Sequence, residues 1–205
     1  MRGLGLLLAL ALALPGGAGA QELPALFAVT DVAAGDVLNV RALPDAKSEV
    51  IGTLAPDATG VEVVALAKGG RWGMVNAGES AGWAAMRFLA PENAAPWWEM
   101  STPLSCYGTE PFWSLEVAPG GASARLSDPN ADDHDLGPVT LWNQPMNRAG
   151  LGLSVATKFA TIFATIEARA CNDRMSDRQY GLSILLLGNL DGVKYGMDGC
   201  CALAR

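Results

Sequence analysis

Short stretches of alternating apolar and polar residues recur through the first half of the chain, between turns that contain glycine or proline. In Val61-Glu62-Val63-Val64, for example, Val61 and Val63 fall on one face of an extended chain and Glu62 falls on the other. Short strands at this spacing are typical of a small barrel or sandwich. The predicted strands are 27–30, 37–41, 50–54, 61–66, 71–75 and 82–85.

The second half also has a mostly β pattern. The continuous apolar run 182–187 predicts a strand that is buried on both faces. The apolar residues of 155–166 follow helical spacing, but this stretch is rich in β-branched residues, so we predict a strand there as well. The predicted strands are 112–117, 123–126, 139–142, 151–155, 162–169, 181–187 and 193–196. The fold class is therefore all-β.

A stretch with two prolines, Pro91 to Pro96, separates the halves and interrupts regular strand pairing. We predict a small β-barrel at 21–93, a linker at 94–100 and a second β-rich, barrel- or sandwich-like domain at 101–205. The adjacent Trp97 and Trp98 are expected to pack into the groove between the two domains.

The first twenty residues have the pattern of a secretory signal peptide. Arg2 precedes an apolar run, Leu4 to Leu14, and the small residues Ala18-Gly19-Ala20 form a cleavage site. The apolar run is shorter than the roughly 20 residues that a membrane span needs. We therefore predict a periplasmic or secreted protein without a membrane span after cleavage.

Charge narrows the range of partners. Removal of residues 1–20 takes away Arg2 alone among the charged residues, so the net charge goes from −7 to −8. An acidic protein is poorly suited to bind a phosphate backbone, so we expect no nucleic-acid partner.

All four cysteines lie in the second half, at positions 106, 171, 200 and 201. Cys106 is expected just before the first strand of the second domain. An even number of cysteines in an exported chain predicts disulfides. A bond between the neighbours Cys200 and Cys201 would be strained, so we expect Cys106 and Cys171 each to pair with one of them, in an order that stays open. Cysteine pairs with metal-site or redox spacing are absent, which favours structural disulfides and no metal or cofactor.

The first domain resembles the bacterial SH3 (SH3b) family. The resemblance covers most of 26–90 and rests on Leu38-Asn39-Val40-Arg41, Gly52-Thr53-Leu54, Trp72-Gly73-Met74-Val75 and Gly82-Trp83. It implies a strongly bent barrel and an accessory module, without catalysis, that binds cell-wall or peptide ligands. Trp72, Trp83 and Arg41 are the candidate ligand-binding residues. The alternatives are barrel packing for the tryptophans, and for Arg41 a role in fixing the loop that follows it.

The second domain resembles a family of uncharacterised exported or membrane-associated bacterial proteins. Its signatures are the segments 108–113 (GTEPFW), 171–180 (CNDRMSDRQY) and 199–201 (GCC). The resemblance implies location and fold rather than an activity.

Two further features could carry chemistry. Glu110, Asp173 and Asp177 could form an acid/base site of a hydrolase, although the two aspartates fit better as turn-formers. His134, the only histidine, lies in an acidic loop that would favour its protonated form. The loop begins with calcium-like spacing at Asp128, Asn130 and Asp132, but it lacks the glycine and glutamate that such loops require later.

The sequence thus predicts an exported, non-enzymatic binding module of the cell envelope that docks a cell-wall or envelope-protein ligand through its first domain. An envelope hydrolase and a structural or inhibitory partner of another envelope protein remain the alternatives.

Overall fold

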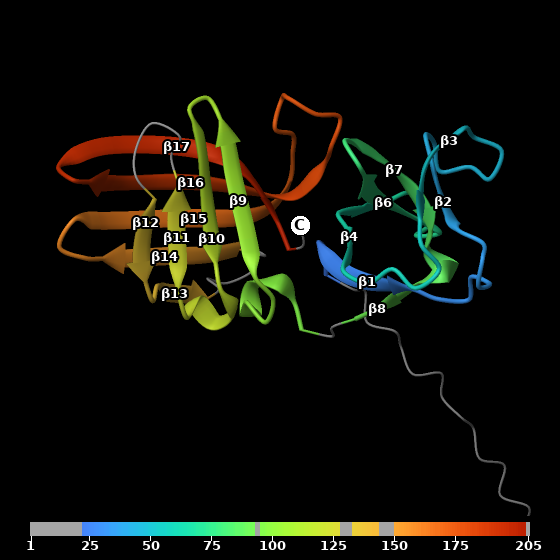
Figure 1. The fold of residues 1–205 in the computed structure, drawn as a ribbon, viewed down its shortest axis with the longest axis horizontal. Helices are drawn as coiled ribbons and strands as arrows, with labels where there is room; N and C mark the ends of the chain where they lie inside the picture. The colour runs from blue at the N-terminus through green and yellow to red at the C-terminus, as the bar shows by residue number, and fades with distance from the viewer. Residues whose placement is uncertain (1–21, 93–94, 128–132, 144–149, 204–205) are drawn as a thin grey trace, which may run out of the picture.

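The computed structural model describes residues 22–92, 95–127, 133–143 and 150–203. The chain is all-β, as predicted, and forms two units that lie side by side (Figure 1). The predicted signal peptide lies outside the described residues.

The N-terminal unit contains a three-stranded sheet in the order β4-β1-β8 and a five-stranded sheet in the order β3-β2-β7-β6-β5. Its elements are β1 (Ala25–Val29), β2 (Leu38–Arg41), β3 (Val50–Leu54), β4 (Val61–Val63), β5 (Ala65–Leu66), β6 (Trp72–Ala77), β7 (Ser80–Ala85), the 3₁₀ helix η1 (Met86–Phe88) and β8 (Leu89–Pro91).

In β1, β2, β4, β6 and β7 every second side chain is buried, and these side chains form a shared core. Phe27, Val40, Val63 and Val75 come from four different strands of the two sheets and are almost fully buried there. The six predicted strands are present with small shifts at their ends. The predicted strand 61–66 is interrupted at Val64 and continues in the other sheet.

The C-terminal unit is one antiparallel sheet of nine strands in the order β12-β11-β10-β9-β17-β16-β15-β14-β13. Its strands are β9 (Leu104–Thr109), β10 (Phe112–Val117), β11 (Ala124–Ser127), β12 (His134–Gly137), β13 (Thr140–Asn143), β14 (Gly150–Ala156), β15 (Ala160–Cys171), β16 (Tyr180–Leu190) and β17 (Val193–Ala202). Two 3₁₀ helices accompany them, η2 (Trp97–Glu99) and η3 (Pro119–Gly121).

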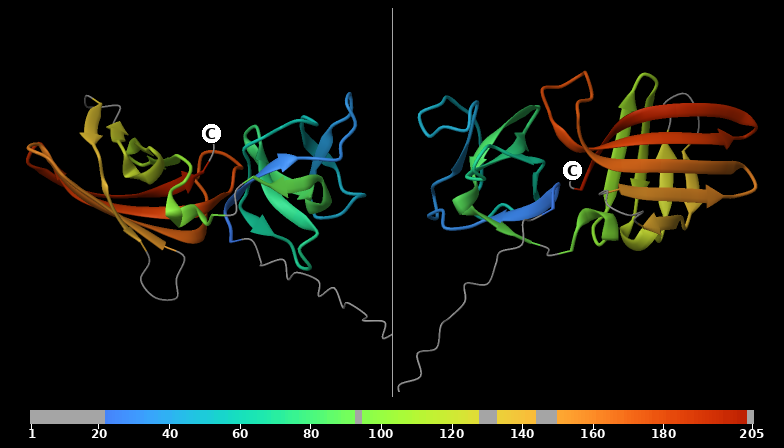
Figure 2. Two further views of the ribbon diagram at one scale, coloured as in Figure 1. Left: turned by 90° about the horizontal axis from the view of Figure 1, so that it is seen from below. Right: turned by 180° about the vertical axis from the view of Figure 1, so that it is seen from behind.

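This sheet is strongly curled, as Figure 2 shows, and its inner face encloses the core. It consists of two runs of consecutively paired strands, β9 to β12 and β13 to β17, which meet where β9 pairs with β17. Three residue pairs form that joint: Cys200 with Tyr107, Cys201 with Cys106, and Ala202 with Ser105. The strands β12 and β13 lie at the two opposite edges of the sheet, but only two residues separate them in the chain. This short connection holds the two edges near one another, so the sheet curls into a half-barrel.

Trp97 and Met100 pack into the core of the C-terminal unit, where each has less than 5% of its surface exposed. Trp98 packs against the same core and stands edge-on to Trp97, with ring centroids 5.7 Å apart. The tryptophan pair therefore belongs to the C-terminal core, rather than to a groove between the two units as expected.

The stretch 155–166 is extended and not helical, as predicted, with a turn at 157–159 between β14 and β15, but two other expectations are wrong. Cys106 lies within β9, not before the first strand; the alternation of that strand was hidden because Ser105, Cys106 and Gly108 are small. The run 182–187 is not buried on both faces, since Leu185 and Leu187 are about half exposed on the outer face. The half-barrel covers only the inner face of β16, and nothing in the described chain packs over the other one at these two positions.

The two units meet along the loop between β15 and β16, which lies beside β6 and β7 (Figure 1). The side chain of Asn76 donates to the carbonyl of Gln179 at 2.8 Å and accepts the N–H of Gln179 at 3.0 Å. The N–H of Ala81 donates to the carbonyl of Asp177. This loop therefore fixes the N-terminal unit through backbone groups, whose bonding does not depend on the side chains of the loop.

Glu62 makes a second contact between the units. Its carboxylate accepts the N–H of Leu203 at 3.0 Å. Burial raises the pKa of Glu62 to about 7, against the opposing effects of the Leu203 hydrogen bond and of the positive charge on Arg178. Alternation correctly places Glu62 opposite to Val61 and Val63, but the face that it occupies is covered by the C-terminal unit.

Candidate functional site

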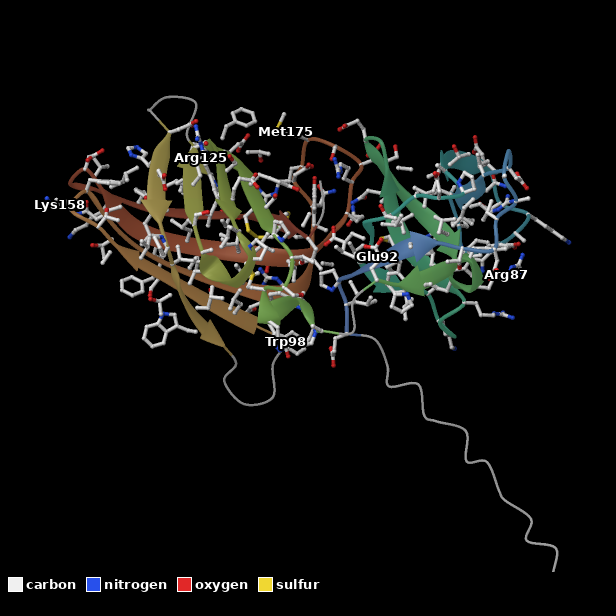
Figure 3. The ribbon with its side chains drawn as sticks, turned by 60° about the horizontal axis from the view of Figure 1, so that its bottom comes forward. Arg87, Glu92, Trp98, Arg125, Lys158 and Met175 are labelled. Carbon is white, nitrogen blue, oxygen red and sulfur yellow. A yellow bond between two sulfur atoms is a disulfide. The ribbon has the colours of Figure 1, made fainter. Side chains whose placement is uncertain are left out.

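Two of the three predicted ligand-binding residues line one pocket of the N-terminal unit. Trp72 and Arg41 border a pocket of about 410 Å³, together with Asp31, Asp36 and Arg87. Its volume lies within the range of about 300–1,000 Å³ that small-molecule pockets occupy. Figure 3 places Arg87 at the end of the N-terminal unit that faces away from the C-terminal unit. We call this the distal pocket.

Arg41 has a structural role in the distal pocket. Its Nη1 donates to the carbonyl oxygen of Ser48 at 2.6 Å, and the Ser48 hydroxyl accepts the N–H of Leu43. This confirms that Arg41 fixes the loop that follows it. A guanidinium carries five N–H donors, so the bond to Ser48 leaves others for a ligand.

Trp83 shares a sheet face with the other two residues but does not line the distal pocket. It lies directly opposite Arg41 on β2 and opposite Met74 on β6, and Trp72 is the next residue on that face of β6. The structure therefore brings Trp72 and Arg41 together at one pocket and places Trp83 beside it. Whether the three bind a ligand stays a prediction.

The three signatures of the second half converge in the C-terminal unit. The turn between β9 and β10 (Thr109 to Phe112), the loop after β15 and the end of β17 line a pocket of about 570 Å³. We call it the braced pocket. The signatures are far apart in the sequence, and the joint between β9 and β17 places them side by side.

Glycines in two of these signatures make room for Trp113. Its ring lies on the inner face against Gly108 and Gly199, so closely that a Cβ at either glycine would overlap the ring. At Gly199 an added Cβ would also lie 2.8 Å from the carbonyl carbon of Tyr107 and 2.9 Å from Cζ2 of Trp113. The two glycines therefore permit the close approach of β9, β10 and β17 beneath the braced pocket.

Asp173 forms the turn that shapes one wall of the braced pocket. Its carboxylate accepts the N–H groups of Met175 and Ser176, the hydroxyl of Ser176 and the hydroxyl of Tyr180. Partial burial raises the pKa of Asp173, but these four donors outweigh it and hold that pKa below its usual value. The prediction that Asp173 forms a turn is confirmed.

Asp177 is separated from the other two candidate carboxylates. Glu110 and Asp173 both line the braced pocket, whereas Asp177 lies on the part of the loop that contacts Ser80 and Ala81 of the N-terminal unit. Asp173 and Asp177 lie in a loop rather than on a helix, so a spacing of four residues does not place them on one face. The alternative of an acid/base pair of Asp173 and Asp177 is therefore not supported, in agreement with their expected role as turn-formers.

Both disulfides lie at the joint of the nine-stranded sheet. Cys106 pairs with Cys201 across β9 and β17 on the inner face, and Cys171 pairs with Cys200. The predicted pattern is confirmed, and the order that the sequence left open is resolved. Cys171 ties the loop after β15 to β17, and both cysteines of this bond line the braced pocket.

His134 is part of a strand, not of an exposed loop. It opens β12, and its ring lies 5.8 Å from that of Phe159, centroid to centroid. Asp128, Asn130 and Asp132 lie outside the described residues. Asp133 pairs with Arg125 on the neighbouring strand, and this salt bridge, together with the hydroxyl of Ser127, lowers the pKa of Asp133.

Neither a cluster of metal ligands nor a membrane-spanning helix is present among the described residues. Nowhere in 22–92, 95–127, 133–143 or 150–203 do three or more His, Cys, Asp or Glu side chains gather as metal ligands would. The same part of the chain has no helix with the length and apolar character that a membrane crossing requires. No family model, no curated protein and no solved structure matches the chain, so the two family resemblances stay predictions.

Proposed function

We propose that this protein is an exported binding module of the bacterial cell envelope and that the distal pocket docks the peptide part of a cell-wall fragment. One observation carries the proposal: Arg41 and Trp72, on separate strands, border the same pocket. The predicted signal peptide and the SH3b resemblance support it from the sequence. Two disulfides are compatible with an oxidising compartment.

The lining of the distal pocket suits a peptide that carries both charges. Asp31 and Asp36 offer carboxylates, Arg41 and Arg87 offer guanidinium groups, and the half-exposed Trp72 offers an aromatic surface. A tryptophan gives a large contact area with one polar end, so it commonly anchors peptide and sugar ligands.

The hydrolase alternative has less support. Both oxygens of the Asp173 carboxylate already accept hydrogen bonds, and Asp177 lies away from Glu110 and Asp173. A general acid at neutral pH needs a raised pKa, and the pKa of Asp173 is lowered. We therefore do not propose a hydrolase.

Co-sedimentation of the oxidised protein with purified peptidoglycan tests the proposal. We expect Trp72→Ala to weaken retention about tenfold or more, because a tryptophan at the centre of a binding site commonly contributes that much. Trp142→Ala is the matched control, since Trp142 is exposed on the C-terminal unit, far from the distal pocket in the fold. Absence of retention by the unaltered protein, or equal loss in both variants, would contradict the proposal. If the protein bound another envelope protein and not peptidoglycan, the proposal of a cell-wall ligand would be wrong.

A further inference from the structure

The braced pocket is lined by four charged side chains that have no partner among the described residues. They are Glu110 on the β9–β10 turn, Asp198 on β17, Arg169 near the end of β15 and Arg174 on the loop that follows. All four are exposed, and none donates or accepts a side-chain hydrogen bond or forms an ion pair within the described chain. Two positive and two negative groups thus border one opening without neutralising one another.

Two apolar side chains border the same opening. Phe112 has 52% of its surface exposed and Met175 has 66%. Figure 3 shows Met175 at the outer end of the β15–β16 loop, directed away from the fold. Methionine adapts its shape to different apolar groups, and phenylalanine offers a flat face, so together they can hold an apolar side chain of varied shape.

The walls of the braced pocket are fixed before any ligand arrives. The Cys171–Cys200 disulfide ties the loop to β17, and the Asp173 carboxylate closes the turn within the loop. The hydroxyl of Thr109 donates to the carbonyl of Asp173 at 3.0 Å, which joins the β9–β10 turn to the loop. Asn76 holds the far end of the loop through Gln179. A preformed site loses little conformational entropy on binding.

We propose that the braced pocket is a second ligand site, separate from the distal pocket, and that it binds a short peptide segment carrying an acidic side chain, a basic side chain and an apolar side chain. A ligand of one charge sign would leave two of the four charged groups unmatched. A neutral glycan could hydrogen-bond to these groups but would offer no opposite charge to any of them. A peptide segment supplies both charges and an apolar group for Phe112 and Met175, and the pocket volume of about 570 Å³ is typical of ligand sites.

The test uses four acetylated and amidated tetrapeptides as probes, titrated into the oxidised protein and followed by calorimetry. Lys-Leu-Ala-Asp carries both charges, Lys-Leu-Ala-Asn and Gln-Leu-Ala-Asp carry one each, and Gln-Leu-Ala-Asn carries none. We expect the doubly charged peptide to bind most tightly. Each singly charged peptide should bind about three- to fivefold more weakly, because exposed charge pairs contribute modestly.

Variants place the binding in the braced pocket. Glu110→Gln and Arg174→Gln each should weaken binding of Lys-Leu-Ala-Asp about three- to fivefold, and the double variant at least tenfold. Glu49→Gln and Arg71→Gln are matched controls, because both residues are exposed on the N-terminal unit and lie outside the pocket lining. Trp72→Ala should leave the part of the binding that depends on Glu110 and Arg174 unchanged, which separates it from any binding of the same peptide in the distal pocket.

Three results would overturn this inference. The first is equal binding of all four peptides, or no binding of any at millimolar concentration. The second is unchanged affinity in the Glu110→Gln, Arg174→Gln double variant. The third is binding of chitotetraose in place of the peptides with the same dependence on Glu110 and Arg174, which would make the braced pocket a glycan site.

Discussion

The two units of this protein differ in how their folds are held. Among the residues that the structure describes, the N-terminal unit has a core of ten buried residues, most of them valine and alanine, and no disulfide. The described part of the C-terminal unit has a core of 22 buried residues and contains both disulfides. If disulfides served to compensate for a small core, they would be expected in the N-terminal unit. Their position in the larger unit indicates another role.

That role is visible at the joint between β9 and β17. Three residue pairs hold together the two runs of strands that form the nine-stranded sheet, and Cys106–Cys201 crosses this joint. Cys171–Cys200 starts from the same end of β17 and holds the loop that lines the braced pocket and contacts the N-terminal unit. The disulfides therefore stabilise a long-range junction and the loop beside it, while the N-terminal unit relies on its core.

The largest expected effect is the loss of the disulfide across the joint. Cys106 and Cys201 are 95 residues apart, so Cys106→Ala with Cys201→Ala should lower the free energy of unfolding by about 4–5 kcal/mol. Cys171 and Cys200 are 29 residues apart, so the matching double variant should lose about 3–4 kcal/mol. Urea denaturation of the oxidised proteins measures both losses. A smaller loss of stability for the 106–201 pair than for the 171–200 pair would contradict the claim that the joint between β9 and β17 depends on its disulfide.

The contact between the two units should make the stability of the protein depend on pH, because Glu62 is buried there. The pKa of Glu62 is raised in the folded protein to about 7 from an ordinary value near 4.5. The contribution of Glu62 to stability is then greatest below about pH 4.5 and is lost as the pH rises to about 7. The loss should reach about 3 kcal/mol, since each pKa unit corresponds to about 1.4 kcal/mol.

Substitution isolates this effect. Glu62→Gln keeps an oxygen that can accept the Leu203 N–H and removes the titration, so the variant should exceed the unaltered protein in stability at pH 8 but not at pH 4.5. Denaturation curves at both pH values measure the difference, with the exposed Glu49→Gln as control. An identical pH dependence in Glu62→Gln and the unaltered protein would show that Glu62 is not buried between the units.

A substitution in the close packing beneath the braced pocket should lower the stability of the protein by an intermediate amount. Gly199→Ala should destabilise the protein by about 2–3 kcal/mol, because the new methyl group meets the backbone of Tyr107, which cannot move without disturbing the joint. Gly196→Ala, on the same strand, meets only the flexible end of Leu187 at 3.1 Å and should cost less than about 1 kcal/mol. Thermal unfolding of the two variants is the measurement. Equal losses would contradict the tight approach of β9 and β17.

The smallest expected effect is at the contact between the units. Asn76→Ala removes two hydrogen bonds to Gln179 and should lower the free energy of unfolding by about 1–2 kcal/mol. Hydrogen exchange should also speed up at the amides of the β15–β16 loop, while the amides in the middle of β16 stay protected. If the exchange rates of the loop amides were unchanged in Asn76→Ala, Asn76 would not be what holds the loop in place.

The local parts of the fold could be predicted from sequence because alternation is a local signal. Val61-Glu62-Val63 shows its pattern within three residues, and most strands were located in this way. β9 was missed because the small residues Ser105 and Gly108 interrupt its apolar pattern. The joint between β9 and β17 leaves no local pattern, since it pairs segments about 95 residues apart.

The candidate site was accessible to sequence reasoning only in part. The signatures around Glu110, Asp173 and Cys200 indicate the segments that form the braced pocket, but not that Asp177 turns away from it toward Ala81. Arg169 and Asp198 were not singled out, because isolated charged residues are common on any surface, and Arg174 was expected only to neutralise the nearby aspartates. Their shared lack of partners becomes apparent only when the loop is folded against β17.

The most direct test of the proposed binding function follows the indole N–H signals of the six tryptophans by NMR during titration with a soluble disaccharide-tetrapeptide from peptidoglycan. Trp72 lines the distal pocket, whereas Trp97 is buried in the C-terminal core and serves as an internal reference. We predict that the Trp72 signal moves in a saturable way and that the Trp97 signal does not. A Trp72 signal that stays in place at millimolar concentrations of the fragment would contradict the claim that this pocket docks a cell-wall ligand.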